Sequence, residues 1–299
     1  MALILALILF LLMMHRLSAP PYEKHMEGFT QMEQFVLKEN QNVYDNFYAE
    51  VYDGLNDTQN RSQKELIEII KMTEPSTKYS VFLDVGSGTG YMVNQLKEAG
   101  YTAYGIDKST DMIDYAETKN PSVEIKNGDV MDPMAFERST FSHILCTNLT
   151  LYLFEDKMTF FRNSYYWLKQ NGYLIIHLVE PDKFELIVPK NNQQLTPVSP
   201  TASSKRKTDA TVHFHDFKYS ASYKLPEANC ANKCVTFKET FVDRDTNHIR
   251  QNEQTLHMNK IDDVLEMASN TGFIFHGKVN MKPINGDKHQ YLYIFERPM

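Results

Sequence analysis

Three glycines and one aspartate occur at a spacing that suits a nucleoside ligand. Gly86, Gly88 and Gly90 recur at every second position, and glycine lets the backbone turn tightly and approach a ligand with no Cβ in the way. A helix that follows such a loop presents free amide groups, which favour an anionic or polar ligand. Asp107 follows at about the 20-residue spacing expected of a carboxylate that binds a ribose diol.

The surrounding sequence predicts the elements that position these residues. Tyr79–Val85 is an apolar run typical of a buried strand, and Tyr91–Ala99 has the pattern of a helix. Tyr101–Ile106 predicts a second strand that ends beside Asp107, and Thr110–Thr118 predicts the helix after it. The glycine loop and Asp107 should therefore meet at the carboxyl ends of neighbouring strands.

The alternation continues beyond this unit. Val123–Ile125, Phe141–Thr147 and Tyr173–Val179 are strand-like, and Asp156–Leu168 is predicted as a helix before the last of them. Alternating strands and helices over this length predict an α/β fold with a Rossmann-like, doubly wound, mostly parallel sheet.

An antiparallel β insertion is predicted late in the chain. Thr211–Tyr223, Cys234–Val242 and His248–His257 alternate apolar with polar residues. After the helix Ile261–Ala268, strands that open at Gly272 and Gln290 are expected to complete the core sheet. The predicted organisation is an apolar segment at residues 1–20, an N-terminal helical lid at 21–75, a Rossmann-like core at 76–182, the insertion at 183–258 and the closing elements at 259–299.

Composition and charge restrict the class of function. Hydrophobic residues make up 42% and charged residues 23% of the chain, as in ordinary globular proteins. A net charge of -7 and a pI near 5.8 make nucleic acid an unlikely partner. Three cysteines are too few for a disulfide framework. Cys230 and Cys234 could be half of a zinc site, but no second pair completes it, so we expect ordinary thiols and no metal.

The N-terminus has a different character from the rest. Met1–Met14 is unbroken apolar sequence followed by His15 and Arg16. It is shorter than the roughly 20 residues of a spanning helix, and no basic residue precedes it as in a secretory signal. Three hypotheses remain: a secretory signal, a helix packed on its own domain, and a short membrane anchor that leaves the domain in the cytoplasm. The anchor is the preferred hypothesis.

The stretch Leu83–Gly90 resembles the first motif of class I S-adenosylmethionine-dependent methyltransferases, and the likeness covers roughly Tyr44–Val179. It implies S-adenosyl-L-methionine as the cofactor. The residues implied in binding it are Asp84, Gly86, Ser87, Gly88, Gly90, Asp107, Lys108, Asp129, Val130 and Asn148. In the family, the residue matching Asp84 orders the loop and contacts the methionine moiety, that matching Asp107 binds the ribose, and that matching Asp129 receives the adenine amine.

Methyl transfer from a sulfonium depends mainly on in-line positioning and exclusion of water, so a dedicated base is optional. Tyr152, Asn148 and Tyr48 are the catalytic candidates that could assist by hydrogen bonding, and packing or turn roles would explain them equally well. His177 lies among apolar residues of a predicted strand and is expected to be a satisfied core histidine.

The insertion is expected, by analogy with the family, to shape the pocket for the methyl acceptor. The residues expected there are Tyr219, Tyr223, Phe237, Phe241, Arg250 and Glu253. The acceptor is left open among a small molecule, a lipid-like molecule and a peptide. Two other functions also remain open: an NAD(P)-dependent oxidoreductase on a related fold, and a catalytically inactive S-adenosylmethionine-binding protein.

Overall fold

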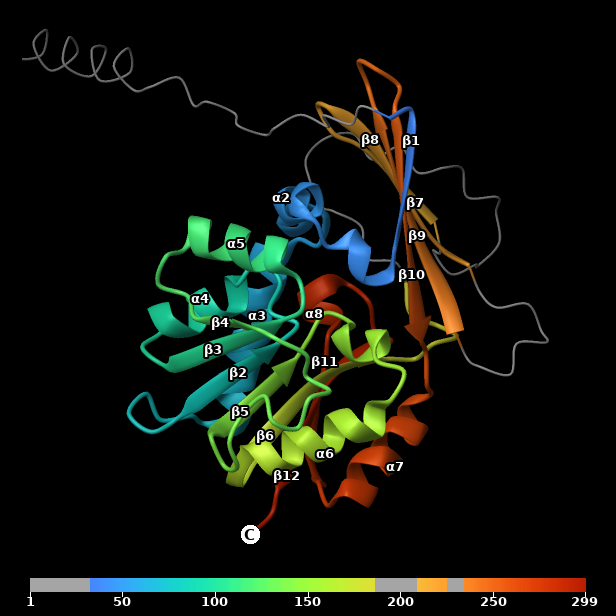
Figure 1. Cartoon of the computed structure of the whole chain (residues 1–299). Coiled ribbons are helices and arrows are strands. Elements are labelled where there is room, and N and C mark those ends of the chain that lie inside the picture. The colour runs from blue at the N-terminus through green and yellow to red at the C-terminus, as the bar shows by residue number, and fades with distance from the viewer. Residues whose placement is uncertain (1–32, 186–208, 225–233) are drawn as a thin grey trace, which may run out of the picture. The chain divides into compact units, whose positions relative to one another are not determined.

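The computed structural model describes residues 33–185, 209–224 and 234–299, which build two β-sheets with helices around the larger one (Figure 1). Residues 33–299 form one compact unit. The apolar segment Met1–Met14 lies outside the described residues, so the predicted membrane anchor receives no support. No helix within the described ranges is both long and apolar enough to cross a membrane.

The larger sheet has seven strands in the order β11-β12-β6-β5-β2-β3-β4. Strands β6, β5, β2, β3 and β4 run parallel, and β12 and β11 are added antiparallel at one edge. The bounds are β2 Val81–Val85, β3 Thr102–Asp107, β4 Ile125–Asn127, β5 Phe141–Cys146, β6 Leu168–Val179, β11 Ile274–Asn280 and β12 Gln290–Arg297. The predicted Rossmann-like sheet and its closure by the last two strands are confirmed.

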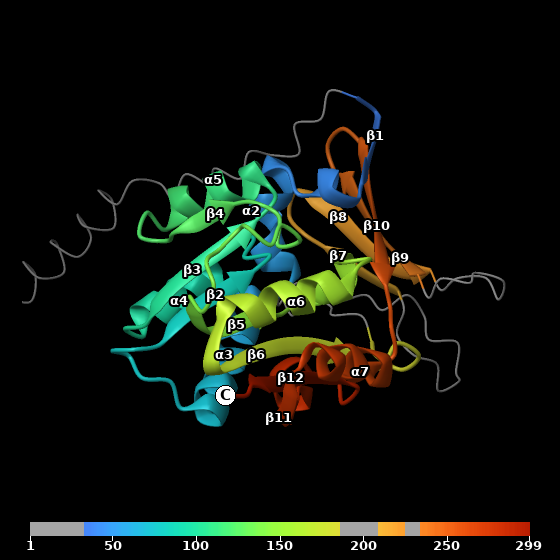
Figure 2. The same ribbon diagram turned by 60° about the horizontal axis from the view of Figure 1, so that its bottom comes forward.

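Helices cover both faces of this sheet (Figures 1 and 2). On one face lie α3 Thr58–Thr73, α4 Tyr91–Glu98, α5 Thr110–Lys119 and α8 Lys282–Asn285, whose apolar side chains share a core with the strands. On the other lie α6 Lys157–Trp167 and α7 Ile261–Thr271. Strand β2 is buried from Phe82 to Val85, as expected of a central strand covered on both sides.

The second sheet has five strands in the order β1-β10-β9-β8-β7 and stands beside α2 Asn46–Leu55 (Figure 1). Its strands are β1 Phe35–Glu39, β7 Asp209–His213, β8 Phe217–Lys224, β9 Cys234–Asp243 and β10 Ile249–His257. All pairings are antiparallel except that of β1 with β10. The predicted antiparallel insertion is thus confirmed. Cys230, one of its two cysteines, lies outside the described residues.

The prediction of one strand over Thr211–Tyr223 is wrong. The chain turns between His213 and Phe217, and the backbone N–H of Phe214 donates to the carbonyl of Phe217 at 2.9 Å. No glycine or proline marks this turn; its only sequence signal is the pair of polar residues His215 and Asp216, which shifts the apolar alternation by one position.

The N-terminal segment 21–75 was predicted to be helical, but the structure shows that it also contains a strand. It contributes β1, which pairs with β10 in a parallel register from Phe35 opposite Ile249 to Glu39 opposite Glu253. This pairing joins residues more than two hundred positions apart, and such a tertiary partner decides the conformation of a five-residue segment over its local preference. The described residues of this segment, 33–75, are therefore part helix and part edge strand of the second sheet.

Strand ends in the core differ from the prediction by a few residues. The strand expected at Val123–Ile125 begins at Ile125, and that expected from Tyr173 begins at Leu168. Asn171 has a φ of 56°, a left-handed conformation that asparagine adopts more readily than most residues with a Cβ.

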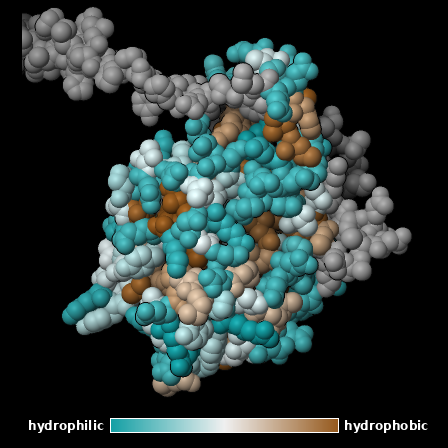
Figure 3. All heavy atoms as spheres, in the orientation of Figure 1, coloured by the Kyte–Doolittle hydropathy of each residue, from teal (hydrophilic) through white to brown (hydrophobic). Residues whose placement is uncertain are grey.

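The face of the molecule in Figure 3 is largely hydrophilic, with a few apolar patches. One patch lies at the upper part of the second sheet, the region to which β1 belongs. Phe35 and Leu37 of β1 are 51% and 44% exposed. The edge strand β11 of the main sheet also carries exposed apolar side chains, Ile274 and Phe275, at 48% and 57%.

Candidate active site

The glycine loop joins β2 to α4 at the carboxyl edge of the main sheet. Gly86, Gly88 and Gly90 have φ values of 64°, 51° and 69°, a region that disfavours residues with a Cβ. A Cβ on Gly86 would also lie 2.7 Å from Cγ2 of Thr150. Glycine at position 86 is therefore required both by the turn and by the close approach of the segment after β5.

Asp107 is held next to this loop at the end of β3. One carboxylate oxygen accepts a hydrogen bond from the backbone N–H of Gly88 at 2.8 Å, and the other accepts from the N–H of Ser109 at 2.9 Å. Burial raises the pKa of Asp107, and these backbone hydrogen bonds oppose that rise. The carboxylate is thus fixed in orientation at the edge of a cleft.

That cleft holds about 770 Å³ of space between atoms, part of it open to solvent. The predicted cofactor residues that line it are Gly86, Gly88, Asp107, Lys108, Val130 and Asn148. Ile106, Met112 and Val130 supply apolar wall, while Asp107 and the loop supply polar groups. A planar base next to a ribose diol needs this combination, so the described residues fit an adenosyl cofactor.

Four of the predicted cofactor residues lie outside the lining of this cleft: Asp84, Ser87, Gly90 and Asp129. Asp84 is 4% exposed, and burial raises its pKa to about 8. Asp129 forms an ion pair with Lys108 at 2.9 Å. Their contacts with the methionine moiety and the adenine amine remain predictions.

Three tyrosines of the N-terminal segment stand against the cleft. Asp45 caps α2 by accepting a hydrogen bond from the backbone N–H of Tyr48 at 3.2 Å. Tyr48 and Tyr52 are four residues apart in α2 and therefore lie along one side of the helix, and Tyr44 stands just before its N-cap. Their ring centroids are 5.7 and 5.8 Å apart, edge to face. The aromatic segment predicted as a lid thus borders the cleft through Tyr44 and Tyr52.

A second pocket, with about 620 Å³ of space between atoms that is partly open to solvent, shares Tyr44, Tyr52, Asn148 and Leu153 with the first. It lies between α2 and the second sheet. Six aromatic rings line it: Tyr44, Tyr48, Tyr52, Tyr219, Tyr223 and Phe237.

Three of the six residues predicted to shape an acceptor pocket, Tyr219, Tyr223 and Phe237, line this one. The others do not. Phe241 packs against Tyr219 with centroids 5.1 Å apart. Glu253 lies on the opposite face of β10, because it alternates with the buried residues of that strand.

Glu239 was missed by the sequence reasoning. It is 1% exposed and lines the second pocket. Its Oε1 accepts hydrogen bonds from the hydroxyls of Tyr219 at 2.7 Å and Tyr48 at 3.1 Å, and its Oε2 accepts from Nδ2 of Asn252 at 3.3 Å. Burial raises its pKa. The sequence did hold a signal that Glu239 belongs to the site. It lies two residues from both Phe237 and Phe241, which places all three on one face of β9.

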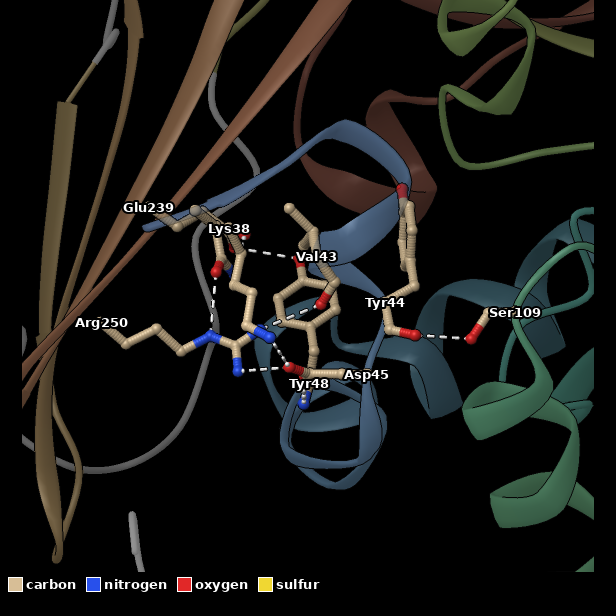
Figure 4. A network of polar contacts seen from close by, with 9 residues as sticks. Lys38, Val43, Tyr44, Asp45, Tyr48, Ser109, Glu239 and Arg250 are labelled. Atoms are coloured by element: carbon tan, nitrogen blue, oxygen red, sulfur yellow. Dashed lines mark hydrogen bonds and ion pairs between the residues drawn. The ribbon is translucent and has the colours of Figure 1, made fainter. Parts of the chain in front are cut away.

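Arg250 connects the second sheet to the lid, as Figure 4 shows. One guanidinium nitrogen donates to Oδ2 of Asp45 at 2.9 Å, and another donates to the carbonyl of Val43 at 3.0 Å. On the other side, the Ser109 hydroxyl donates to the carbonyl of Tyr44 at 2.5 Å. The lid is therefore tied both to the second sheet and to the segment after Asp107.

The three catalytic candidates occupy different places. Asn148 lines both pockets and Tyr48 lines the second. Tyr152 is fully buried and lines neither, and its hydroxyl accepts from the backbone N–H of Val179 at 2.9 Å. Tyr152 is therefore in the position of a packing residue. Asn148 and Tyr48 remain the catalytic candidates, because their side chains border the pockets.

The turn that carries Asn148 is strained. Asn148 and Leu149 have φ values of 48° and 65°, a left-handed conformation that asparagine adopts readily but that is costly for leucine. Nδ1 of His177 accepts the backbone N–H of Leu149 at 3.2 Å, and its Nε2 is 3.0 Å from Oε1 of Gln290. His177 is thus the satisfied core histidine that was expected, and it also supports this turn.

Comparison with known proteins gives a family for the core. Residues 83–176 match the family model described as a methyltransferase domain. A curated dTDP-3-amino-3,6-dideoxy-alpha-D-glucopyranose N,N-dimethyltransferase from Streptomyces fradiae is 30% identical over 107 residues, which cover 34% of this chain and 40% of that relative. The match thus spans less than half of the curated relative.

Solved structures share the fold over most of the chain. An S-adenosylmethionine-dependent methyltransferase from Clostridium acetobutylicum has a TM-score of 0.63 at 17% identity, covering 85% of this chain and 99% of its own. The CcbJ methyltransferase from Streptomyces caelestis has a TM-score of 0.66 at 14% identity, and the match covers 86% of this chain and 98% of CcbJ. The likeness therefore extends to the second sheet and is not confined to the Rossmann-like core.

Proposed function

We propose that this chain, a member of the class I S-adenosylmethionine-dependent methyltransferases, transfers a methyl group from S-adenosylmethionine to a small-molecule acceptor in the second pocket. The observation that carries the proposal is the meeting of two pockets at Tyr52 and Asn148. One fits an adenosyl cofactor and the other is lined by the lid and the second sheet. Two ligands bound there would face each other across these two side chains.

The bound cofactor would supply a sulfonium methyl group open to in-line attack. In this proposal Asp107 accepts hydrogen bonds from the ribose diol, the glycine loop holds the methionine moiety, and Val130 lies along the adenine ring. The ring of Tyr52 borders both pockets, where it could attract the sulfonium cation. These residues act by holding and orienting the reactants, which supplies much of the acceleration of such a reaction.

A small acceptor is favoured over a peptide or a lipid. The second pocket is bounded on one side by α2 and on the other by β8, β9 and β10, which leaves room for a compact molecule. The net charge of -7 gives no support to a nucleic-acid substrate. The curated relative with the amino-sugar name supports a small acceptor in the same way.

Calorimetric titration of S-adenosylmethionine, S-adenosylhomocysteine and NADH into the full chain tests the cofactor. We expect both adenosyl ligands to bind in the micromolar range, NADH not to bind, and Asp107→Ala to weaken adenosyl binding at least about tenfold. Asp114→Ala, at an exposed position seven residues away, is the control.

The outcomes separate the alternatives. Binding of NADH in place of the adenosyl ligands would favour an oxidoreductase. Adenosyl binding without methyl transfer to any member of a broad small-molecule panel, followed by mass spectrometry, would favour a catalytically inactive binding protein. Absence of adenosyl binding would refute the proposed function.

A further inference from the structure

We propose that the second pocket recognises its acceptor by an amino group, which Glu239 binds and deprotonates before methylation. The inference rests on the proposed function and adds the substrate class. Glu239 is almost wholly buried and lines the pocket, and among the described residues it forms no ion pair with a cationic side chain. A buried carboxylate without a cation is costly, so a ligand that supplies the cation gains affinity.

Arg250, a cation on the neighbouring strand β10, forms its hydrogen bonds with residues other than Glu239. Arg250 donates through Nε to Oδ1 of Asn252 at 2.9 Å and through its terminal nitrogens to Asp45 and to the carbonyl of Val43. The groups that do reach Glu239 are two tyrosine hydroxyls and the Asn252 amide. These neutral donors stabilise the carboxylate, and Arg250 also lowers its pKa without forming a direct ion pair with it.

The walls of the pocket suit both the substrate and the product cation. Ring faces attract ammonium groups and continue to attract them after N-methylation, when fewer N–H bonds remain for hydrogen bonding. The pocket is lined by six aromatic rings from α2, its N-terminal flank and the second sheet. The lining therefore suits a methylated amine as well as a primary amine.

Gln254 indicates a second recognition point. It is 5% exposed and lines the same pocket, and within the described residues its Nε2 forms no hydrogen bond of good geometry; its polar neighbour there is the Tyr44 side chain, whose pKa it lowers. A buried amide donor without a good hydrogen bond is costly, and an oxygen atom of the acceptor would satisfy it. The pocket thus fits an amine that also carries a hydroxyl or ether oxygen, such as an amino alcohol or amino sugar.

The chemical step balances without a further reactant. Glu239 takes one proton from the bound ammonium, which leaves a lone pair on the nitrogen. The nitrogen then bonds to the methyl carbon while the carbon–sulfur bond breaks and its electron pair stays on sulfur. The products are the N-methylammonium ion and S-adenosylhomocysteine, and the proton on Glu239 passes to solvent. Burial, which raises the pKa of Glu239, favours its transient protonation.

The test compares matched ligands on the full chain saturated with S-adenosylhomocysteine. Calorimetry measures D-glucosamine against D-glucose and benzylamine against benzyl alcohol. We expect at least one amine to bind about tenfold more tightly than its oxygen counterpart, and Glu239→Gln to abolish that preference. Glu253→Gln, on the opposite face of β10, should retain it, and both variants should bind S-adenosylhomocysteine within about threefold of the wild type.

Failure of this inference differs from failure of the proposed function. Binding of S-adenosylhomocysteine without preference for either amine, including no binding of any probe, overturns the amine proposal alone. Absence of S-adenosylhomocysteine binding in the wild type overturns the proposed function. If Glu239→Gln does not fold, as judged by circular dichroism, Tyr219→Phe replaces it and should weaken the amine preference; an unchanged preference counts against the role of Glu239.

Discussion

Nδ2 of Asn148 donates a hydrogen bond to the hydroxyl of Tyr52 at 2.7 Å, across 96 residues of sequence. The two side chains come from the end of β5 and from α2, and both border the cofactor cleft and the second pocket. Burial raises the pKa of Tyr52 to about 12, so its hydroxyl stays protonated near neutral pH. The bond therefore closes the lid against the main sheet at the junction of the two pockets.

Tyr52→Phe should reduce methyl transfer more than cofactor binding. The variant keeps the ring but leaves the Asn148 amide without its hydroxyl partner, so we expect kcat to fall about tenfold while the Kd of S-adenosylhomocysteine changes less than about threefold. Tyr79→Phe, at a tyrosine that is 69% exposed, is the control. Equal losses in both quantities would show that the hydroxyl serves cofactor binding or folding.

Gly86→Ala should weaken cofactor binding and stability together. The backbone φ at this position is 64°, and an added Cβ would lie 2.7 Å from Cγ2 of Thr150. We therefore expect the free energy of unfolding to fall by about 1–2 kcal/mol and the Kd of S-adenosylhomocysteine to rise. Gly54→Ala is the matched control, because it lies in α2 with no atom within 4 Å of its added Cβ and should stabilise by about 0.5–1 kcal/mol. If both variants behave alike in urea denaturation and calorimetry, the steric argument fails.

The core was predictable because its signals are local. The apolar run of β2, the glycine loop and the aspartate after β3 each follow from a short stretch of sequence, and they give the order of elements and the position of the cofactor cleft. The turn at Asn171 was predictable for the same reason, since asparagine tolerates the left-handed region.

The second pocket was predictable only in part, because distant residues build it. Glu239 becomes a site residue through hydrogen bonds to Tyr48, 191 residues away, and to Tyr219 on the neighbouring strand. Tyr152 had the right residue type but points to the backbone of Val179, which no local pattern reveals. The pairing of β1 with β10 was missed for the same reason.

Arg250→Ala should destabilise the fold. The Arg250 side chain is 6% exposed and binds Asp45, Val43 and Asn252. Its removal takes a donor from the Val43 carbonyl and from Oδ1 of Asn252, while Asp45 keeps Lys38 at 3.3 Å; we expect a cost of about 2–4 kcal/mol in unfolding free energy. Asp45→Asn should cost less, because an amide oxygen can still cap α2. The exposed Arg138→Ala serves as control in urea denaturation, and an equal effect of the Arg138 and Arg250 variants would contradict the prediction.

His177 should make stability depend on pH in a way that its substitution removes. Burial lowers its pKa from 6.5 to about 3, so the unfolded chain binds a proton below pH 6.5 that the native chain does not. The stabilising contribution is full above pH 6.5 and is lost as the pH falls towards 3, at about 1.4 kcal/mol per pH unit.

The difference in unfolding free energy between the wild type and His177→Asn should therefore become smaller as the pH falls. At pH 7.5 the variant should be the less stable protein, since Nδ1 of His177 accepts the N–H of Leu149 and its ring fills a fully buried site. Between pH 6.5 and pH 5 the gap should shrink, because only the wild type carries the depressed histidine, while other groups such as His143, whose pKa burial also lowers to about 3, are present in both. Urea denaturation at pH 7.5, 6.0 and 5.0 measures the gap, and a gap that stays constant would show that His177 is protonated equally in both states.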